Sequence, residues 1–163
     1  MGSAKTRKPG TRNAGAQGFD QTEAKLASWS TLAFTQVLLG IQVAGVTNYL
    51  ALPQAGSSLF ALVSPGTYTA TNVGRLAWKS LIANSSLQSN CNKEGFNTGS
   101  QFGACRIGIL GNQENDCNTP DSFLGIGCNL NGGSFTVGNY ANAQWQPDNG
   151  GKATTGFGYV FVR

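Results

Sequence analysis

The 163-residue sequence contains no histidine, and only 11% of its residues are charged. Without histidine, the chain cannot form Ser-His-Asp or Cys-His catalytic groups, imidazole metal sites or histidine general bases. Only seven residues are acidic, so few carboxylate pairs are available for acid–base chemistry. We therefore expect a protein that is not an enzyme and has no catalytic residues. A surface with so little charge is also less protected against self-association than that of an average soluble domain.

Glycine and asparagine take up much of the missing charge, with 23 and 15 residues respectively. Both residue types favour turns and short strands over long helices. A chain of this length, with 40% hydrophobic residues, can bury a core of its own within one domain. We predict a β-rich fold, all-β or α+β: an antiparallel sheet or sandwich with one or two short helices and a long Gly/Asn-rich region of disulfide-bonded loops.

The net charge of +4 comes from the N-terminus, because the other 151 residues hold seven basic and seven acidic side chains. The first twelve residues include four basic ones: Lys5, Arg7, Lys8 and Arg12. We predict that residues 1–25 form a basic flexible arm or leader and that residues 26–163 form a single β-rich domain. Small coat proteins combine such a nucleic-acid-binding arm with a β-rich body. This alternative is in tension with the cysteines, whose pattern fits assembly inside a cell poorly.

Four cysteines lie within 38 residues: Cys91, Cys105, Cys117 and Cys128. An even number in a Gly/Asn-rich region predicts two disulfides, whereas the spacing does not match the paired Cys-x-x-Cys ligands of zinc sites. Three pairings are open, of which the pairing of sequence neighbours is the simplest. Because disulfides persist in oxidising compartments, we expect the protein to be extracellular or on the cell surface.

Residues 31–52 form the most apolar window, which is long enough to span a bilayer. Polar side chains such as Gln42 and Asn48 would be costly in a membrane, and apolar residues alternate with other residues along the first half of the window. We therefore predict no transmembrane helix but two strands, joined by a turn at Ala44-Gly45 and ended by Pro53.

Shorter elements are predicted along the rest of the chain. A helix capped by Ser57-Ser58 is expected at residues 59–63, and a second helix at residues 73–82. The second helix would place Leu76, Trp78, Leu81 and Ile82 against the core, and Trp29 is also expected there. Strands are predicted at residues 105–110, 122–128, 135–137 and 156–162. The last of these is rich in aromatic residues, so we expect it to be a central strand.

The segment from Gly111 to Ser122 holds three of the seven acidic residues among several side-chain amides. Calcium ions prefer such oxygen ligands, which makes Asn112, Glu114, Asp116 and Asp121 a candidate calcium site. Two alternatives are a structural loop whose polar side chains cap turns, and a pair of catalytic carboxylates.

Two single residues are candidates for other functions. Trp145 lies in a polar segment and is a candidate for stacking on sugar rings, or a loop aromatic folded onto the core. Asn84 opens an Asn-Ser-Ser glycosylation sequence, which matters only in a secreted eukaryotic protein.

Several segments resemble an extracellular domain of secreted bacterial proteins and of invertebrate skeletal or extracellular-matrix proteins. They are SLQSNCNKEGFN at residues 86–97, RIGILGNQENDCNTPDSFLGIG at residues 106–127, DNGGK at residues 148–152 and GYVFV at residues 158–162. The resemblance implies a secreted, disulfide-bonded, non-catalytic module of matrices, adhesion or surface assembly. The closing residues GYVFVR also resemble the ends of fibrinogen-like lectin domains.

These observations predict a non-catalytic extracellular structural or adhesive protein that forms homo-oligomers or polymers, such as a fibre or surface layer. The first alternative is a carbohydrate-binding domain that uses calcium. The second is a small coat protein with a basic nucleic-acid-binding arm.

Overall fold

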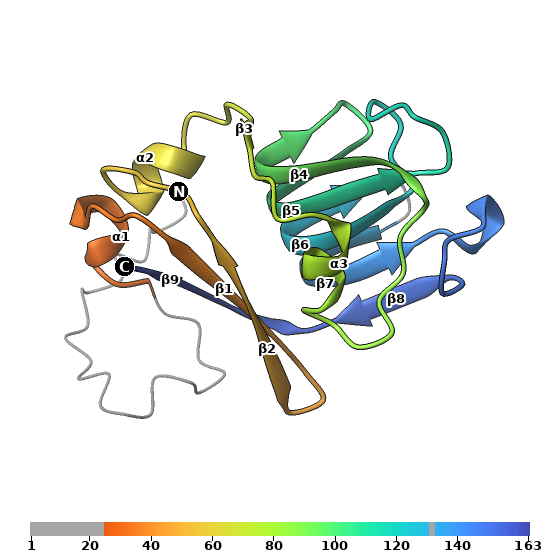
Figure 1. Ribbon diagram of the computed structural model, residues 1–163, viewed down its shortest axis with the longest axis horizontal. Coiled ribbons are helices and arrows are strands. Elements are labelled where there is room, and N and C mark those ends of the chain that lie inside the picture. Colours follow the sequence, from red (N-terminus) through yellow and green to blue (C-terminus); the bar gives the residue numbers. More distant parts are fainter. Residues whose placement is uncertain (1–24, 131–132) are drawn as a thin grey trace, which may run out of the picture.

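The computed structural model describes residues 25–130 and 133–163, which form two antiparallel β-sheets packed on a shared core (Figure 1). The smaller sheet has the strand order β2-β1-β9, and the larger one is a six-stranded meander from β3 to β8. The strands are β1 (Val37–Val43), β2 (Val46–Leu52), β3 (Thr69–Ala70), β4 (Asn90–Gly99), β5 (Gly103–Asn112), β6 (Ser122–Leu130), β7 (Gly133–Ala141), β8 (Lys152–Thr155) and β9 (Phe157–Val162). The predicted β-rich fold class is confirmed.

The hairpin of β1 and β2 has the turn that the sequence predicts, and β2 ends just before Pro53 as expected. Its seven residue pairs run without a bulge from Val43–Val46 at the turn to Val37–Leu52 at the open end. Ala44 and Gly45 both have positive φ, at 50° and 82°, as a tight two-residue hairpin turn requires. Among the described residues, no helix is long and apolar enough to cross a membrane.

Three short α-helices and one 3-10 helix connect the strands: α1 (Ser28–Thr31), α2 (Leu59–Val63), α3 (Arg75–Lys79) and η1 (Ala143–Trp145). The predicted cap of α2 is confirmed, because the Ser58 hydroxyl accepts a hydrogen bond of 3.1 Å from the backbone N–H of Ala61. In α3 Trp78 is fully buried, but the prediction for Leu76 is wrong, since its side chain is 81% exposed. Residues two positions apart in an α-helix lie about 200° from each other around its axis, so burying Trp78 turns Leu76 outward.

The Gly/Asn-rich part of the chain is mostly sheet, and the strands predicted there extend further than expected. The prediction missed β4 altogether, and it treated the glycines as turn residues. Four of them instead form a row across the middle of the larger sheet, in the pairs Gly95–Gly108, Gly108–Gly125 and Gly125–Gly138. A Cβ on Gly125 would lie 2.3 Å from the Ile107 carbonyl oxygen, so only glycine allows the strands to approach this closely.

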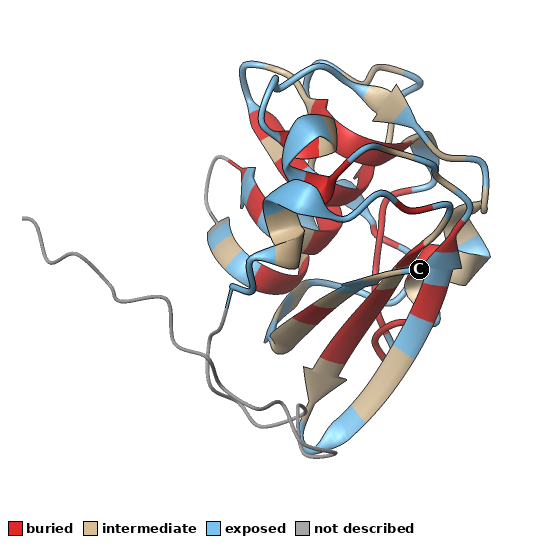
Figure 2. Ribbon diagram, turned by 90° about the vertical axis from the view of Figure 1, so that its left-hand side faces the viewer, coloured by how far each residue is buried: buried red, intermediate tan, exposed pale blue. Residues whose placement is uncertain are grey.

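The main core lies between the two sheets, with α2 and α3 contributing. Leu39 and Ile41 of β1 meet Phe96, Ile109 and Leu124 of the larger sheet in this cluster. In Figure 2, buried and exposed residues alternate along the upper half of β2, the strand that rises from the hairpin turn at the bottom of the view. The inner face of the smaller sheet is thus apolar, as alternation predicts.

Two further predictions concern aromatic residues. The expectation that the last strand is central is wrong: β9 pairs with β1 alone, so it is an edge strand of the smaller sheet. Trp78 takes the predicted core position, and Trp29 is partly buried against the same cluster. Aromatic content reflects the packing of side chains over a face of the sheet, and it does not report how many neighbours a strand has.

Candidate functional site

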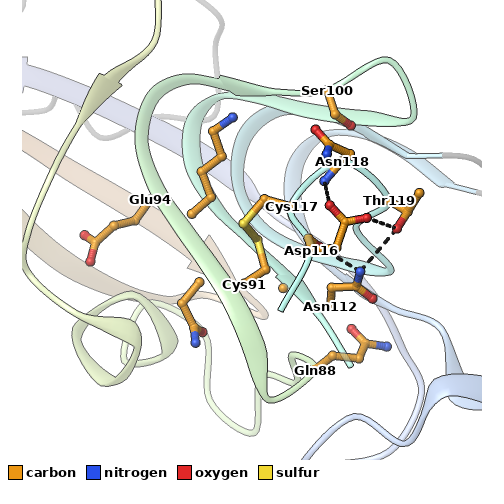
Figure 3. The surroundings of a disulfide bond; sticks show 12 residues. Gln88, Cys91, Glu94, Ser100, Asn112, Asp116, Cys117, Asn118 and Thr119 are labelled. Carbon is orange, nitrogen blue, oxygen red and sulfur yellow. Dashed lines mark hydrogen bonds between the residues drawn. A yellow bond between two sulfur atoms is a disulfide. The ribbon is translucent and has the colours of Figure 1, made fainter. Parts of the chain in front are cut away.

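The loop from Gln113 to Asp121 is tied to β4 by a disulfide between Cys91 and Cys117 (Figure 3). Cys91 and Asn92 have positive φ values of 64° and 53°, at an irregularity in the pairing of β4 with β5. Such a bulge redirects a side chain, and this one lies at Cys91, whose side chain reaches the loop. The loop is therefore anchored both at its ends and near its middle.

The second disulfide joins Cys105 and Cys128, which are directly opposite each other on β5 and β6 with their Cα atoms 4.0 Å apart. The simplest pairing, between sequence neighbours, is thus wrong. The antiparallel register decides the pairing, because it brings the β5 and β6 cysteines together and leaves Cys91 next to the loop cysteine. Among the described residues, no cysteine is free.

Two of the four predicted calcium ligands use their polar atoms to hold the loop together. The amide of Asn112 donates to the Asp116 carbonyl oxygen at 2.8 Å and to the Thr119 hydroxyl at 3.3 Å. The Asp116 carboxylate accepts hydrogen bonds from the Asn118 backbone N–H at 2.9 Å and from the Thr119 hydroxyl at 3.0 Å, and these lower the pKa of Asp116. Figure 3 shows these bonds beside the disulfide. They have the geometry expected of the structural-loop alternative.

The other two predicted ligands, Glu114 and Asp121, interact through their charges. Burial raises the pKa of Asp121, and the negative charge of Glu114 raises it further. A cation between the two carboxylates would relieve this repulsion. In the part of the chain that the structure describes, no three acidic, histidine or cysteine residues are grouped to hold a metal ion. The calcium site thus stays a prediction, with Glu114 and Asp121 as its remaining charged ligands.

The other candidate residues lie apart from this loop. Trp145 ends η1 and is 39% exposed, so it is not folded back onto the core. Asn84 is exposed with a φ of 55°, two residues before the fully buried Ser86. The arm residues Lys5, Arg7, Lys8 and Arg12 lie outside the described residues.

Sequence reasoning missed a buried carboxylate on β4. Glu94 is only 9% exposed, and its oxygens accept hydrogen bonds from the backbone N–H groups of Val73 and Gly74, the Thr71 hydroxyl and the Trp78 indole, at 2.7–3.1 Å. Burial alone would raise the pKa of Glu94, but these hydrogen bonds outweigh it and lower the pKa. Glu94 therefore attaches α3 and the segment before it to the larger sheet.

A second unpredicted carboxylate, Asp148, also holds α3 in place. It pairs with Arg75 at 2.7 Å and with Lys79, and it accepts a hydrogen bond of 3.1 Å from the backbone N–H of Leu87. Burial would raise its pKa, but the bonds from Lys79, Arg75 and Leu87 outweigh burial and lower it. No local pattern in the sequence marks Glu94 or Asp148, because their partners lie 16 to 73 residues away.

Glu94, Asp116 and Asp148 thus all accept hydrogen bonds from backbone N–H groups. Large apolar side chains are also exposed at several places among the described residues, including two on β2. Val46 and Tyr49 of β2 are 63% and 43% exposed, and no strand among the described residues pairs with the outer edge of β2. We therefore take this edge as the candidate interaction site.

Comparison with known proteins adds no assignment. No family model, no curated protein and no solved structure matches the chain. The resemblance to an extracellular-matrix domain accordingly stays a prediction.

Proposed function

We propose that this chain is a non-catalytic structural or adhesive protein that works outside the cell by associating with copies of itself. The observation that carries the proposal is the edge strand β2, which is seven residues long, contains no charged residue and no proline, and pairs with β1 on one side only. Soluble proteins usually protect long edge strands with charges, prolines or bulges, because an open edge invites another strand to pair with it. An edge without these protections suits a protein that assembles.

Two further properties support the proposal. The two disulfides are compatible with an oxidising, extracellular environment, since such bonds are rare in the reducing cytosol. The low content of charged residues, 11% of the chain, lowers the electrostatic barrier to association.

Sedimentation velocity of the full chain, from micromolar to millimolar concentration at physiological salt, tests the proposal. We expect the average sedimentation coefficient to rise with concentration, and electron microscopy of the concentrated samples to show oligomers, fibres or sheets. A chain that stays monomeric over this range in both measurements would contradict self-association.

The exposure of Trp145 favours carbohydrate binding as a second candidate function. An exposed indole offers a flat apolar face to a sugar ring, and a calcium ion at Glu114 and Asp121 would supply a polar contact elsewhere on the surface. A glycan array probed with and without calcium tests this function. Binding that is lost in Trp145→Ala would support it, whereas a blank array under both conditions would exclude it for the glycans displayed.

A further inference from the structure

The backbone groups on the outer edge of β2 follow from the hairpin geometry. In a two-residue hairpin the pair next to the turn, here Val43–Val46, is hydrogen-bonded, and bonded and non-bonded pairs then alternate. Both the N–H and the C=O of Thr47, Tyr49 and Ala51 therefore point away from β1. Three donors and three acceptors are thus presented along one edge of the sheet.

The other sheet edges offer less. β3 has two residues, and β8 has four and begins with Lys152. β9 lies next to β7 at its start, where the Gly156 N–H donates to the Val137 carbonyl at 3.1 Å. Of the four edge strands described, β2 is the longest: it has seven residues against six in the likewise uncharged β9. β2 also exposes Val46 and Tyr49, and its hairpin tip stands at the lower end of the molecule in Figure 1.

The sequence of β2 is complementary to itself when two copies run antiparallel with Tyr49 opposite Tyr49. Thr47 of one copy then lies opposite Ala51 of the other, so all three outward-pointing residues meet outward-pointing residues, and six backbone hydrogen bonds form. In this register the inner face of one copy continues into the inner face of the other, because Val46 of one lies opposite Leu52 of the other on that side. The pairing ends at Gly45 and Pro53, so it uses the whole strand and nothing beyond it.

The geometry points to a second copy of this chain as the partner of β2, paired antiparallel about a two-fold axis at Tyr49. The two smaller sheets then become one six-stranded sheet, β9-β1-β2-β2-β1-β9. This inference rests on the proposed self-association and adds its site, partner and register. A two-fold contact is closed, so it forms a dimer, and growth into a fibre or layer requires a further surface.

Several features favour a second copy over another partner. β2 has no charged residue that would select a partner of opposite charge, and its two most exposed apolar residues, Val46 and Tyr49, are both covered by the self-pairing. Asn48, on the inner side, donates to the Leu81 carbonyl at 3.4 Å, which helps to hold the strand in an extended form ready for pairing. An aromatic pair across the axis adds a favourable cross-strand contact.

Charges placed at positions 47 and 51 test both the site and the register. In the proposed dimer, residue 47 of each copy lies opposite residue 51 of the other. Thr47→Lys/Ala51→Lys and Thr47→Glu/Ala51→Glu therefore create two like-charged cross-strand pairs, whereas Thr47→Lys/Ala51→Glu creates two opposite-charged pairs. The two variants with Lys at position 47 both lose the 3.0 Å hydrogen bond that Gln42 donates to Thr47, so they are matched controls for the folded monomer.

We measure the dissociation constant by sedimentation velocity, with the thermal midpoint of dilute protein as the check on folding. We expect both like-charged variants to weaken association by about tenfold or more, and the mixed variant to associate as tightly as the wild type or more tightly. The difference between variants should shrink at high salt.

The failures are distinguishable. If the wild type associates but the like-charged variants associate equally well, β2 is not the interface, while self-association itself stands. If like-charged and mixed variants all dissociate, the strand is involved but the register about Tyr49 is wrong. If the wild type is monomeric throughout, the inference and the proposed function fail together.

Discussion

The two sheets of this protein are stabilised in different ways. The larger sheet carries both disulfides. The carboxylates Glu94 and Asp148 lie on it or against it, and they bind residues that are distant in the sequence. The smaller sheet has no cysteine and no charged residue in any of its three strands, and it depends on apolar packing against the core. The larger sheet is thus cross-linked and held by carboxylates, while the smaller sheet is neutral and has β2 and β9 as its edge strands.

Among the variants that test this comparison, removing a disulfide from the larger sheet should lower the free energy of unfolding the most. Cys105→Ala/Cys128→Ala opens a cross-link with a sequence separation of 23, and the chain-entropy estimate predicts a loss of about 3.5 kcal/mol in the free energy of unfolding. Denaturant unfolding of variant and wild type measures it. A loss below about 1 kcal/mol would show that the hydrogen-bonded register alone holds β5 to β6.

Truncating a core residue of the smaller sheet should lower the free energy of unfolding somewhat less. This loss should be the same under oxidising and reducing conditions. Leu39→Ala removes a fully buried side chain, for which we expect a loss of about 3 kcal/mol. Leu38→Ala, on the opposite face and only partly buried, is the matched control and should cost about 1 kcal/mol. Equal losses from the two variants would contradict the assignment of an apolar inner face to this sheet.

Neutralising Glu94 should have the smallest effect of the three, and it should depend on pH. Glu94→Gln replaces a carboxylate that accepts four hydrogen bonds, and we expect a loss of about 2 kcal/mol at neutral pH. Because the folded-state pKa is lowered from its usual 4.5, the carboxylate stabilises the fold above that pH, and this contribution is lost as the pH falls through the folded-state pKa.

Unfolding free energies of wild type and Glu94→Gln from pH 7 downward measure this dependence. The gap between the two proteins should be constant near neutrality and close as the pH falls below 4.5. A gap that does not change with pH would mean that Glu94 acts through packing rather than through its charge.

The same comparison separates what the sequence could predict from what it could not. The β1–β2 hairpin and the Ser58 cap were predictable because alternation, turn residues and capping are local signals. The attachment of α3 by Glu94 was not, because the partners of that carboxylate come from residues 71–78 and only the fold brings them to β4. The glycines were visible in the sequence, but their role as a row across the sheet depends on the register of four strands.

The candidate site divides in the same way. The sequence indicated the polar loop around Cys117, since it follows from residue types in a short segment. It left open whether Trp145 is exposed or folded onto the core, which only the structure decides. It could not show that Asn112 and Asp116 would bond to the loop itself, because these contacts depend on side-chain directions. The open edge of β2 required the strand order, which places β1 between β2 and β9.

Amide hydrogen exchange, followed residue by residue at increasing protein concentration, tests the central claim most directly. If β2 is the self-association edge, the outward-pointing amides of Thr47, Tyr49 and Ala51 should exchange more slowly as the protein associates, while the amides of β8, an edge strand of the larger sheet, should not change. Association without any slowing at these three amides, or with slowing at β8 instead, would contradict the account.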